Sequence, residues 1–435
     1  MLVACATCST TVLAQLGSAT GSPRPSGSVS VYTNISRMET EDGVSRDAQE
    51  VSTSATYSLS ERDSDGLVYG IDVRHAHSAA RRSVDRLSLY EGYVGARIAG
   101  GRMLLRGGHL WLNDLGALGS VAGGAFEMRS RPGTLSKAGV LRAGGFVGLE
   151  PNVFDRGYAD GVRKYGAYIA FDGERARRHS IGVVGIRHGS MSERSVVAAT
   201  NFLPVGRKCF MYQAAEIDMS APGGRSQRGL NYFLTNVRIA PTLRFDVQGN
   251  FSRGRSIDAR GITEDTLVGR TVSPATLEGF LYQSMGGRVS VEVAPRVRLN
   301  AGYARDNNNR DDAATSRVSF GGYAGNVARS GFDVSGSDSL VDRASGPYHS
   351  RYLSIGRQIG RAVYLSGDVS TSLAILRFSR SDGVIVEMRP HTTRLTGTAV
   401  INVSRATSLL VTIERTVDDS VRDLRVLSGI TYRLR

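Results

Sequence analysis

Long hydrophobic runs are absent from the 435-residue sequence, and no window approaches the roughly 18 consecutive apolar residues that a transmembrane helix needs. Stretches of Ala, Leu, Glu and Lys at helical spacing are almost missing too, which argues against a helix-rich soluble enzyme. Proline (11 residues) and tryptophan (only Trp111) are scarce. Glycine is abundant, with 52 residues, and Ser, Thr, Val and Arg are frequent. This mixture is typical of strands and tight turns.

Lysine is nearly absent, so the positive charge of the chain comes almost entirely from arginine. The 54 Lys and Arg residues exceed the 40 acidic residues by 14, and only Lys137, Lys164 and Lys208 are lysines. Two interpretations stay open: a bias of composition, or a surface that attracts anionic solutes or lipid phosphates. Nucleic acid is not an expected partner, because no zinc-finger spacing, helix-turn-helix pattern or basic helix occurs.

Cysteine is rare, and Cys5, Cys8 and Cys209 do not indicate a disulfide framework. Residues 1–14 are small and apolar, and we expect a signal peptide that lacks the usual basic start and is cleaved after Ala14. Cleavage there would remove the first two cysteines. A lipoprotein cleavage box at residues 2–5 and an unstructured tail are the alternatives. Residues 15–26, rich in Gly, Ser and Pro, are expected to form a flexible lead-in.

Apolar and polar residues alternate over about ten residues at a time, the pattern of a half-buried strand. The chain from Arg288 to Tyr303 has the pattern of a hairpin, with its turn at Ala294–Pro295. A second hairpin of the same design is expected between residues 233 and 251, with its turn at Ala240–Pro241. The alternation is clearest between residues 363 and 435. Each of these strands has one apolar face and one face that carries charges.

These strands predict an all-β fold, a closed antiparallel transmembrane β-barrel over residues 27–435. A soluble β-sandwich, a propeller and a β-helix are the alternatives. Three features favour the barrel: strands of about ten to fourteen residues, tight turns that alternate with longer polar loops, and polar faces charged as a water-filled lumen would be. The candidate segments give roughly 18 to 22 strands, and an even number is expected in bacterial barrels.

The last strand, Leu424 to Arg435, resembles the C-terminal assembly signal of bacterial outer-membrane proteins. Tyr432 and Leu434 hold two alternate outward positions, although Arg435 follows where a final aromatic residue usually stands. The segment from Gly101 to Gly108 is similar to an early strand of porin-like barrels. The resemblance identifies no subfamily, and it implies passive diffusion or a structural role in the outer membrane of Gram-negative bacteria. The implied partners are the lipid bilayer with its lipopolysaccharide, the outer-membrane assembly machinery and small solutes, and the oligomeric state stays open.

Strand parity assigns a set of charged side chains to the lumen, where arginines would favour anions and set up a field against nearby acids. The alternative is that these charges pair with one another and only brace the wall. The predicted pore-lining residues are Arg238, Arg244, Asp246, Arg288, Glu292, Arg296, Arg298, Asp368, Arg394, Arg425 and Arg433.

A loop that folds inward would narrow such a lumen. Residues 150–161 are the first candidate, because they mix acids, arginine and aromatics, and residues 255–273 are the second. Within the first loop, the constriction candidates are Glu150, Asp155, Arg156 and Asp160.

Sequence signatures of catalysis are missing, since there is no H-E-x-x-H, no Walker A loop and no nucleophile elbow. His75 and His77 share a strand face but have no apparent third ligand, so no catalytic, metal or cofactor site is expected. We therefore predict a porin-like channel for small, anionic solutes. A plugged barrel with a structural or export-assembly role and a hydrolase embedded in the barrel are the alternatives.

Overall fold

The computed structural model describes residues 25–59, 64–79, 84–131, 139–151, 157–206, 208–220, 229–379 and 385–434. The expected signal peptide and most of the expected lead-in lie outside this part of the chain, and both stay predictions.

The main sheet consists of 22 strands. The first eleven are β1 (Ser26–Thr40), β2 (Ser45–Leu59), β3 (Gly66–Ser78), β4 (Val84–Ile98), β5 (Met103–Trp111), β6 (Ser120–Arg129), β7 (Gly139–Pro151), β8 (Tyr158–Gly173), β9 (Arg178–His188), β10 (Met191–Val205) and β11 (Cys209–Ser220). The other eleven are β12 (Gly229–Thr242), β13 (Phe245–Ser256), β14 (Phe280–Ala294), β15 (Val297–Asn308), β16 (Thr315–Val327), β17 (Phe332–Asp342), β18 (Tyr348–Ile359), β19 (Val363–Ala374), β22 (His391–Asn402), β23 (Thr407–Asp418) and β24 (Val421–Leu434).

The connections contain a small amount of further secondary structure. β20 (Leu376–Ser379) and β21 (Ile385–Met388) form a separate hairpin. The helical segments are η1 (Asn113–Gly119), η2 (Glu174–Ala176), α1 (Ala259–Leu267) and α2 (Pro274–Glu278). No helix among the described residues is long and apolar enough to cross a membrane.

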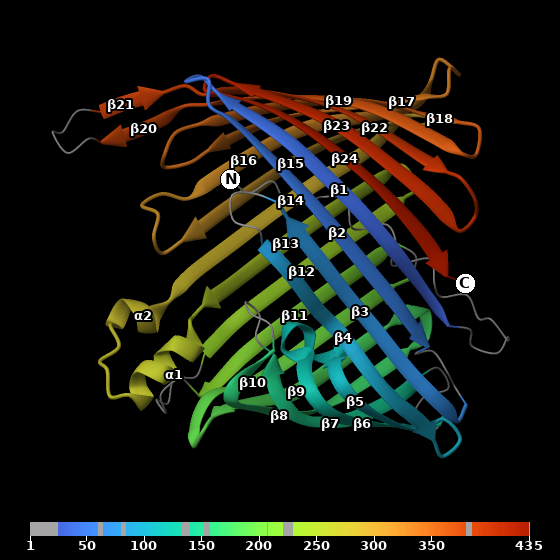
Figure 1. Ribbon diagram of the computed structural model, residues 1–435, viewed down its shortest axis with the longest axis vertical. Helices are drawn as coiled ribbons and strands as arrows, with labels where there is room; N and C mark the ends of the chain where they lie inside the picture. The colour runs from blue at the N-terminus through green and yellow to red at the C-terminus, as the bar shows by residue number, and fades with distance from the viewer. Residues whose placement is uncertain are drawn as a thin grey trace.

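The sheet closes on itself. Each strand pairs antiparallel with its neighbours in the sequence, β19 pairs with β22 across the small hairpin, and β1 pairs with β24. Figure 1 shows the strands running obliquely around one body, as the closure of a barrel requires. The ring gives every strand two hydrogen-bonded partners and leaves no open edge. The predicted closed antiparallel barrel with an even strand number is confirmed, at the upper bound of the expected 18 to 22.

Neighbouring residues of a strand have different surroundings, because their side chains point to opposite faces of the wall. On β9, Val183 is 54% exposed whereas Val184 is 2% exposed. On β13, Phe245 is 37% exposed and Asp246 is 4% exposed. Large apolar side chains are exposed in this way around the ring, on strands from β1 to β24. An apolar belt of this extent on the outside of a closed barrel fits the hydrocarbon core of a bilayer.

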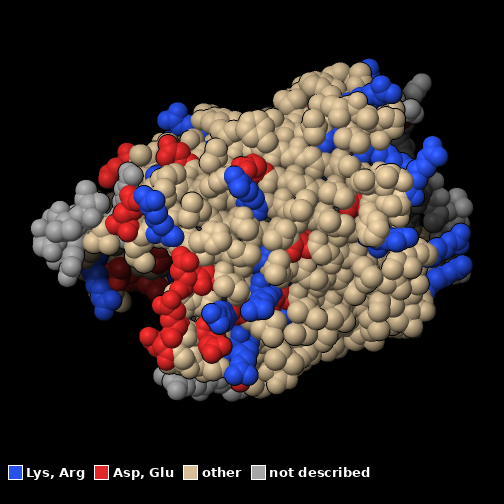
Figure 2. All heavy atoms as spheres, turned by 90° about the horizontal axis from the view of Figure 1, so that it is seen from above, with Lys and Arg blue, Asp and Glu red and all other residues tan. Residues whose placement is uncertain are grey.

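The two ends of the barrel differ in their connections. The turn end carries both described termini and short turns, such as residues 99–102, 243–244, 295–296 and 403–406. The loop end carries the longest connections, which contain α1, α2 and the β20–β21 hairpin (Figure 1). On the face drawn in Figure 2 acidic side chains are concentrated toward the loop end, whereas basic side chains lie at both ends.

The turn expected at Ala240–Pro241 is wrong, because the chain reverses at residues 243–244. β12 continues through the proline, since the Ala240 amide donates to the Lys208 carbonyl oxygen at 2.6 Å in the preceding connection. A proline is tolerated here because this protruding strand end needs few ladder hydrogen bonds. Leu243, which we expected in an apolar row of the wall, lies instead in the turn and is 95% exposed.

We predict that an arginine on the outer face destabilises the barrel according to its depth. Val183→Arg, in the middle of β9, should lower the free energy of unfolding by about 2–4 kcal/mol, because a guanidinium at the bilayer midplane loses its hydration. Ile401→Arg, one residue from the end of β22, should cost about 1 kcal/mol or less. Denaturant titration in lipid vesicles measures both values, and equal costs would contradict the assigned depths.

Candidate functional site

The inner face of the wall can be followed through the pairing register from β9, where Val184 is buried, around the ring to β24. Nine of the predicted pore-lining residues lie on this face, namely Arg238, Asp246, Arg288, Glu292, Arg298, Asp368, Arg394, Arg425 and Arg433. The remaining two, Arg244 and Arg296, lie in two-residue turns at the turn end. Arg296 has a φ of 67°, which places it in the left-handed region.

Asp246 is the centre of one inner-face cluster. Its carboxylate accepts hydrogen bonds from Nη1 of Arg298 at 3.2 Å, from Nε2 of Gln248 at 3.2 Å and from Nη2 of Arg238 at 3.5 Å. Arg298 also donates from Nη2 to the Leu243 carbonyl oxygen at 3.3 Å. The cluster therefore brings together side chains from β12, β13 and β15 near the turn end.

The other predicted charges differ in whether they are paired. Arg425 donates to Asp423 at 2.6 Å, and Arg394 lies 3.9 Å from Glu414. By contrast, the side chains of Arg288 and Arg433 are exposed and make no ion pair within the described part of the chain. The inner wall thus combines paired arginines, which brace it, with others that face the lumen without a carboxylate partner.

Two of the predicted acids accept hydrogen bonds from groups other than a guanidinium. Asp368 accepts a hydrogen bond from the Tyr352 hydroxyl at 2.8 Å. A carboxylate oxygen of Glu292 accepts from the Arg296 amide at 3.3 Å, which stabilises the turn between β14 and β15.

The connection between β5 and β6 folds into the barrel. Leu112, Leu115 and Leu118 are 2%, 1% and 6% exposed, and they belong to one buried cluster with Val184. Leu115 lies directly over Gly182 on the inner face of β9, since a Cβ added to that glycine would overlap with Leu115 Cδ2. The helical turn η1 therefore covers the inner side of β8, β9 and β10.

Asp114 fastens η1 to the wall. Its carboxylate accepts from Nη1 and Nη2 of Arg142 on β7 at 2.8 and 2.9 Å, and from Nη2 of Arg178 on β9 at 2.8 Å. Its carbonyl oxygen accepts from the Ser180 hydroxyl at 2.9 Å. Bidentate guanidinium–carboxylate pairs are among the strongest hydrogen bonds that side chains make. We name Asp114, Arg142 and Arg178 the latch.

The latch continues into a larger charge network through Arg142, which is 6% exposed. Its guanidinium donates to Glu127 at 2.8 Å and to Asp172. Glu127 also accepts from the Tyr168 hydroxyl at 2.7 Å and from Nε of Arg129 at 2.8 Å. Counting the latch, three carboxylates face three guanidinium groups. Buried charges need this balance, because an unpaired one loses its hydration without compensation.

This arrangement makes the lumen asymmetric. The inner side of β5 to β10 is covered by leucines and a balanced charge network, in which Arg142, Asp114 and Glu127 are buried. The inner side of the strands from β12 to β24 carries the polar and charged groups described above, several of them exposed. A solute in the lumen would meet a filled side and a wet, charged side.

Of the predicted constriction residues, Glu150 is the one whose side chain the structure places. Its carboxylate lies 2.8 Å from Nζ of Lys164, which is 1% exposed on the inner face of β8. Asp155 and Arg156 lie outside the described residues, and Asp160 is described only as part of the β8 backbone. Constriction by residues 150–161 therefore stays a prediction.

The second candidate loop contains α1, and this helix packs against the barrel wall. Arg260 donates to Glu193 of β10 at 2.8 Å, and Ile262 is 2% exposed. The helix begins with a cap, since the Asp258 carboxylate accepts from the Gly261 amide at 2.9 Å. The segment is thus held at the loop end.

Sequence reasoning missed η1 and the latch. One signal was present: Leu112, Leu115 and Leu118 recur at every third position, which places them on one face of a 3₁₀ helix. Three leucines at this spacing in a loop are expected to pack against an apolar surface and not to face water. The partners of Asp114 give no such signal, because Arg142 and Arg178 are 28 and 64 residues away in the sequence.

The predicted assembly residues lie on the closing strand. Tyr432 is 48% exposed on the outer face of β24, opposite Val29 of β1, and Leu434 points the same way at the end of the strand. Recognition of these two residues by assembly machinery stays a prediction. Within the described residues, no group of His, Cys, Asp and Glu side chains is placed to hold a metal ion.

No family model and no curated protein matches the chain. Solved structures do match it over most of its length. A P pilus tip assembly intermediate of Escherichia coli, PapC–PapD–PapK–PapG, is similar with a TM-score of 0.50 and 11% identity, over 94% of this chain and 61% of that chain. The translocation pore of the P pilus usher PapC has a TM-score of 0.48 and 12% identity, over 94% of this chain and 100% of the other.

OccAB4 of Acinetobacter baumannii is similar over 94% of this chain and 98% of its own, with a TM-score of 0.44 and 9% identity. At such low identities the likeness concerns the fold alone. The chain is a closed 22-stranded barrel whose fold resembles that of the pilus assembly intermediate, and no subfamily is identified.

We predict that Arg142→Met lowers the free energy of unfolding by about 3–5 kcal/mol, because the buried carboxylates of Asp114 and Glu127 lose their shared partner. The control is Arg288→Met, an exposed inner-face arginine without an ion pair in the described residues, which should change stability by about 0.5 kcal/mol or less. Denaturant titration in vesicles measures both variants. Similar values for the two would mean that the network does not stabilise the fold.

Proposed function

We propose that the protein is a porin-like channel in the outer membrane of Gram-negative bacteria, through which small solutes diffuse passively. The proposal depends on one observation: a closed ring of 22 strands has an apolar outer face and a charged inner face. A ring of this size is too wide for its wall side chains alone to fill, so the interior holds water or inward-folded segments. The inward segment described above covers only one side of the wall.

The lengths of the loops indicate which end of the barrel faces the periplasm and which faces the exterior. Bacterial outer-membrane barrels have short turns on the periplasmic side and longer loops outside. By this rule the turn end faces the periplasm, and the loop end, with α1, α2 and the β20–β21 hairpin, faces the exterior. Lipopolysaccharide of the outer leaflet and the assembly machinery, which would read Tyr432 and Leu434, are partners in this proposal.

The inner-face arginines support anions as the preferred solutes. Arg288 and Arg433 expose their guanidinium groups toward the lumen without a carboxylate partner in the described residues. Asp246 is shared by two arginines, so that cluster keeps an excess of positive charge. A wall of this kind raises the local concentration of anions and lowers that of cations.

The positions of the histidine–carboxylate pairs do not support an enzymatic role. The two histidine–carboxylate ion pairs of the described residues, His75 with Asp85 and His349 with Asp338, lie on strand positions that face outward. The neighbours in register are exposed apolar residues, Leu340 being 55% exposed beside His349. We therefore propose a non-enzymatic channel.

Planar-bilayer recording tests the proposed function. The refolded barrel should give steady ohmic conductance steps, with a reversal potential in a salt gradient that indicates a preference for anions. A plugged barrel with a structural or export-assembly role would give no steady steps, and that result would overturn the proposal.

We predict that Arg298→Leu reduces the preference for anions, because one of two guanidinium groups at Asp246 is lost. The reversal potential should shift toward the cation-selective direction. Arg305→Leu is the matched control, since Arg305 is exposed on the outer face of the same strand and should leave selectivity unchanged. Equal shifts in the two variants would place Arg298 outside the conduction path.

We also predict that Asp114→Asn increases single-channel conductance. The amide keeps the size of the side chain but loses the charge that Arg142 and Arg178 bind, so η1 leaves its position over β9 more often. The same recordings should show larger or more variable steps. Asp423→Asn is the control, because Asp423 pairs with Arg425 on one strand and fixes no loop. Unchanged conductance in Asp114→Asn would mean that η1 does not limit the passage.

A further inference from the structure

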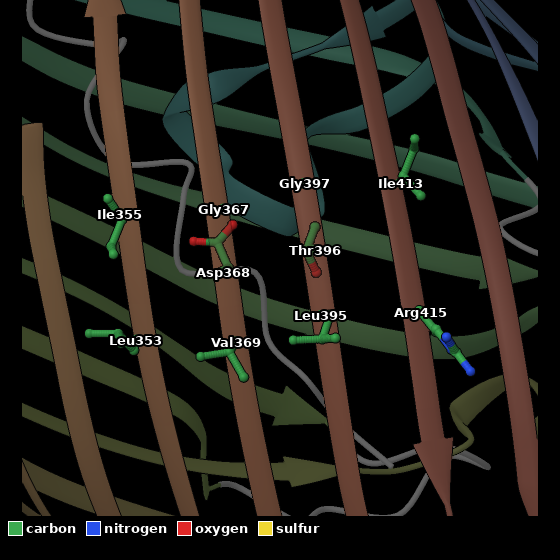
Figure 3. Close-up of a pocket in the computed structure, with 10 residues that line it drawn as sticks. All are labelled: Leu353, Ile355, Gly367, Asp368, Val369, Leu395, Thr396, Gly397, Ile413 and Arg415. Atoms are coloured by element: carbon green, nitrogen blue, oxygen red, sulfur yellow. The ribbon is translucent and has the colours of Figure 1, made fainter.

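A groove of about 480 Å³ lies across β18, β19, β22 and β23, and its side chains belong to the outer face of the barrel. Two rows of paired residues form it (Figure 3). The first row consists of Leu353, Val369, Leu395 and Arg415. The second row consists of Ile355, Gly367, Gly397 and Ile413. The groove is thus apolar along its length, and Arg415 is its one charged side chain on the outer face. Asp368 and Thr396 also line it between the two rows, but by register their side chains belong to the inner face.

The floor of the groove is bare backbone. Gly367 and Gly397 lie directly opposite each other on β19 and β22. A Cβ added to either glycine would meet no atom within 4 Å, so the space above them is open. Their neighbours in the row, Ile355 and Ile413, are 45% and 52% exposed and stand beside the gap as walls. The shape suits a flexible apolar chain.

Arg415 supplies the charge. It lies three residues before the end of β23 at the loop end, beside Leu395, and it makes no hydrogen bond or ion pair within the described residues. Outward arginines flank the groove on both sides: Arg422 on β24 is exposed one row beyond Arg415, and the two on β18 have partners. Arg351 donates to Asp338 at 3.2 Å, and the guanidinium of Arg357 stacks on the ring of Phe332 at 4.9 Å.

We propose that this groove binds a phosphorylated membrane lipid of the leaflet at the loop end. One acyl chain lies over Gly367 and Gly397, and Arg415 binds the phosphate. Thr371 and Thr393, a pair of hydroxyl residues on the next row toward the loop end, give the headgroup a polar border. A guanidinium binds phosphate through charge-assisted hydrogen bonds, and these are strong at the edge of the hydrocarbon.

The charge of Arg415 and the position of the groove on the outer face together favour a phosphorylated lipid as the ligand. An apolar groove on the outside of a membrane barrel is covered by lipid, and the single unpaired cation at its polar end favours an anionic headgroup over a neutral one. The inference requires the barrel to lie in a bilayer, but it does not require the lumen to conduct. Lipid binding and conductance can therefore succeed or fail separately.

Native mass spectrometry of the full-length barrel in detergent tests the proposal. The probes are lipid A, a phosphorylated lipid of the outer leaflet, and the same lipid with its phosphates removed. The unmodified protein should retain lipid A about tenfold more tightly than the phosphate-free form, as one charge-assisted interaction implies. Arg415→Gln should abolish this difference, and Gly397→Leu should weaken the binding of both forms by filling the groove.

Two control variants separate this site from the rest of the outer face. Arg305→Gln removes an outward arginine three residues before the end of β15, away from the groove, and Gly249→Leu fills open space on the outer face of β13. Both should bind lipid A like the unmodified protein. If either control loses as much binding as its partner variant, or if Arg415→Gln and Gly397→Leu keep full binding, the proposal is overturned. Heat-modifiable migration on a detergent gel verifies that each variant is folded.

Discussion

The pairing of β1 with β24 is the constraint on which the rest of the structure depends. In hydrocarbon no water is present to satisfy a backbone amide or carbonyl, and each unsatisfied group costs several kcal/mol. An open sheet would expose two rows of such groups. Closure removes both rows at once, and it also separates an inside from an outside. Only after that separation can one face of every strand be apolar and the other charged.

The charged side chains of the inner face impose a second requirement, because a charge that is removed from water needs a partner of opposite charge. The structure meets this requirement in two ways. Near β5 to β10 Arg142, Asp114 and Glu127 are buried together, and with Arg129, Arg178 and Asp172 they form a balanced set of three guanidinium groups and three carboxylates. Along β12 to β24 most of the charges are in contact with solvent, and Arg288 and Arg433 need no protein partner because water hydrates them. Burial therefore requires pairing in this barrel, whereas exposed charges are paired in some cases and unpaired in others.

Alternation along a strand is a local property, and for this reason the sequence predicted the barrel, its even strand number and the inner position of nine charged residues. Contacts between distant segments were not predictable in the same way. The latch joins residues 28 and 64 positions apart, and the Ala240 amide at the end of β12 donates to the carbonyl oxygen of Lys208, which lies 32 residues earlier. The groove requires Gly367 and Gly397 to be paired, and two glycines 30 residues apart reveal nothing in the sequence until the register is known.

The inward turn over Gly182 has a geometrical consequence. In a barrel with bare walls the open space would be centred on the barrel axis. Here a helical turn, its leucines and the salt-bridged side chains beneath it thicken one side of the wall. The remaining cross-section is eccentric, displaced toward the strands that carry the exposed guanidinium groups. A molecule crossing the barrel would travel along that wall and not down the middle, so the position of a single eight-residue connection sets which strands it meets.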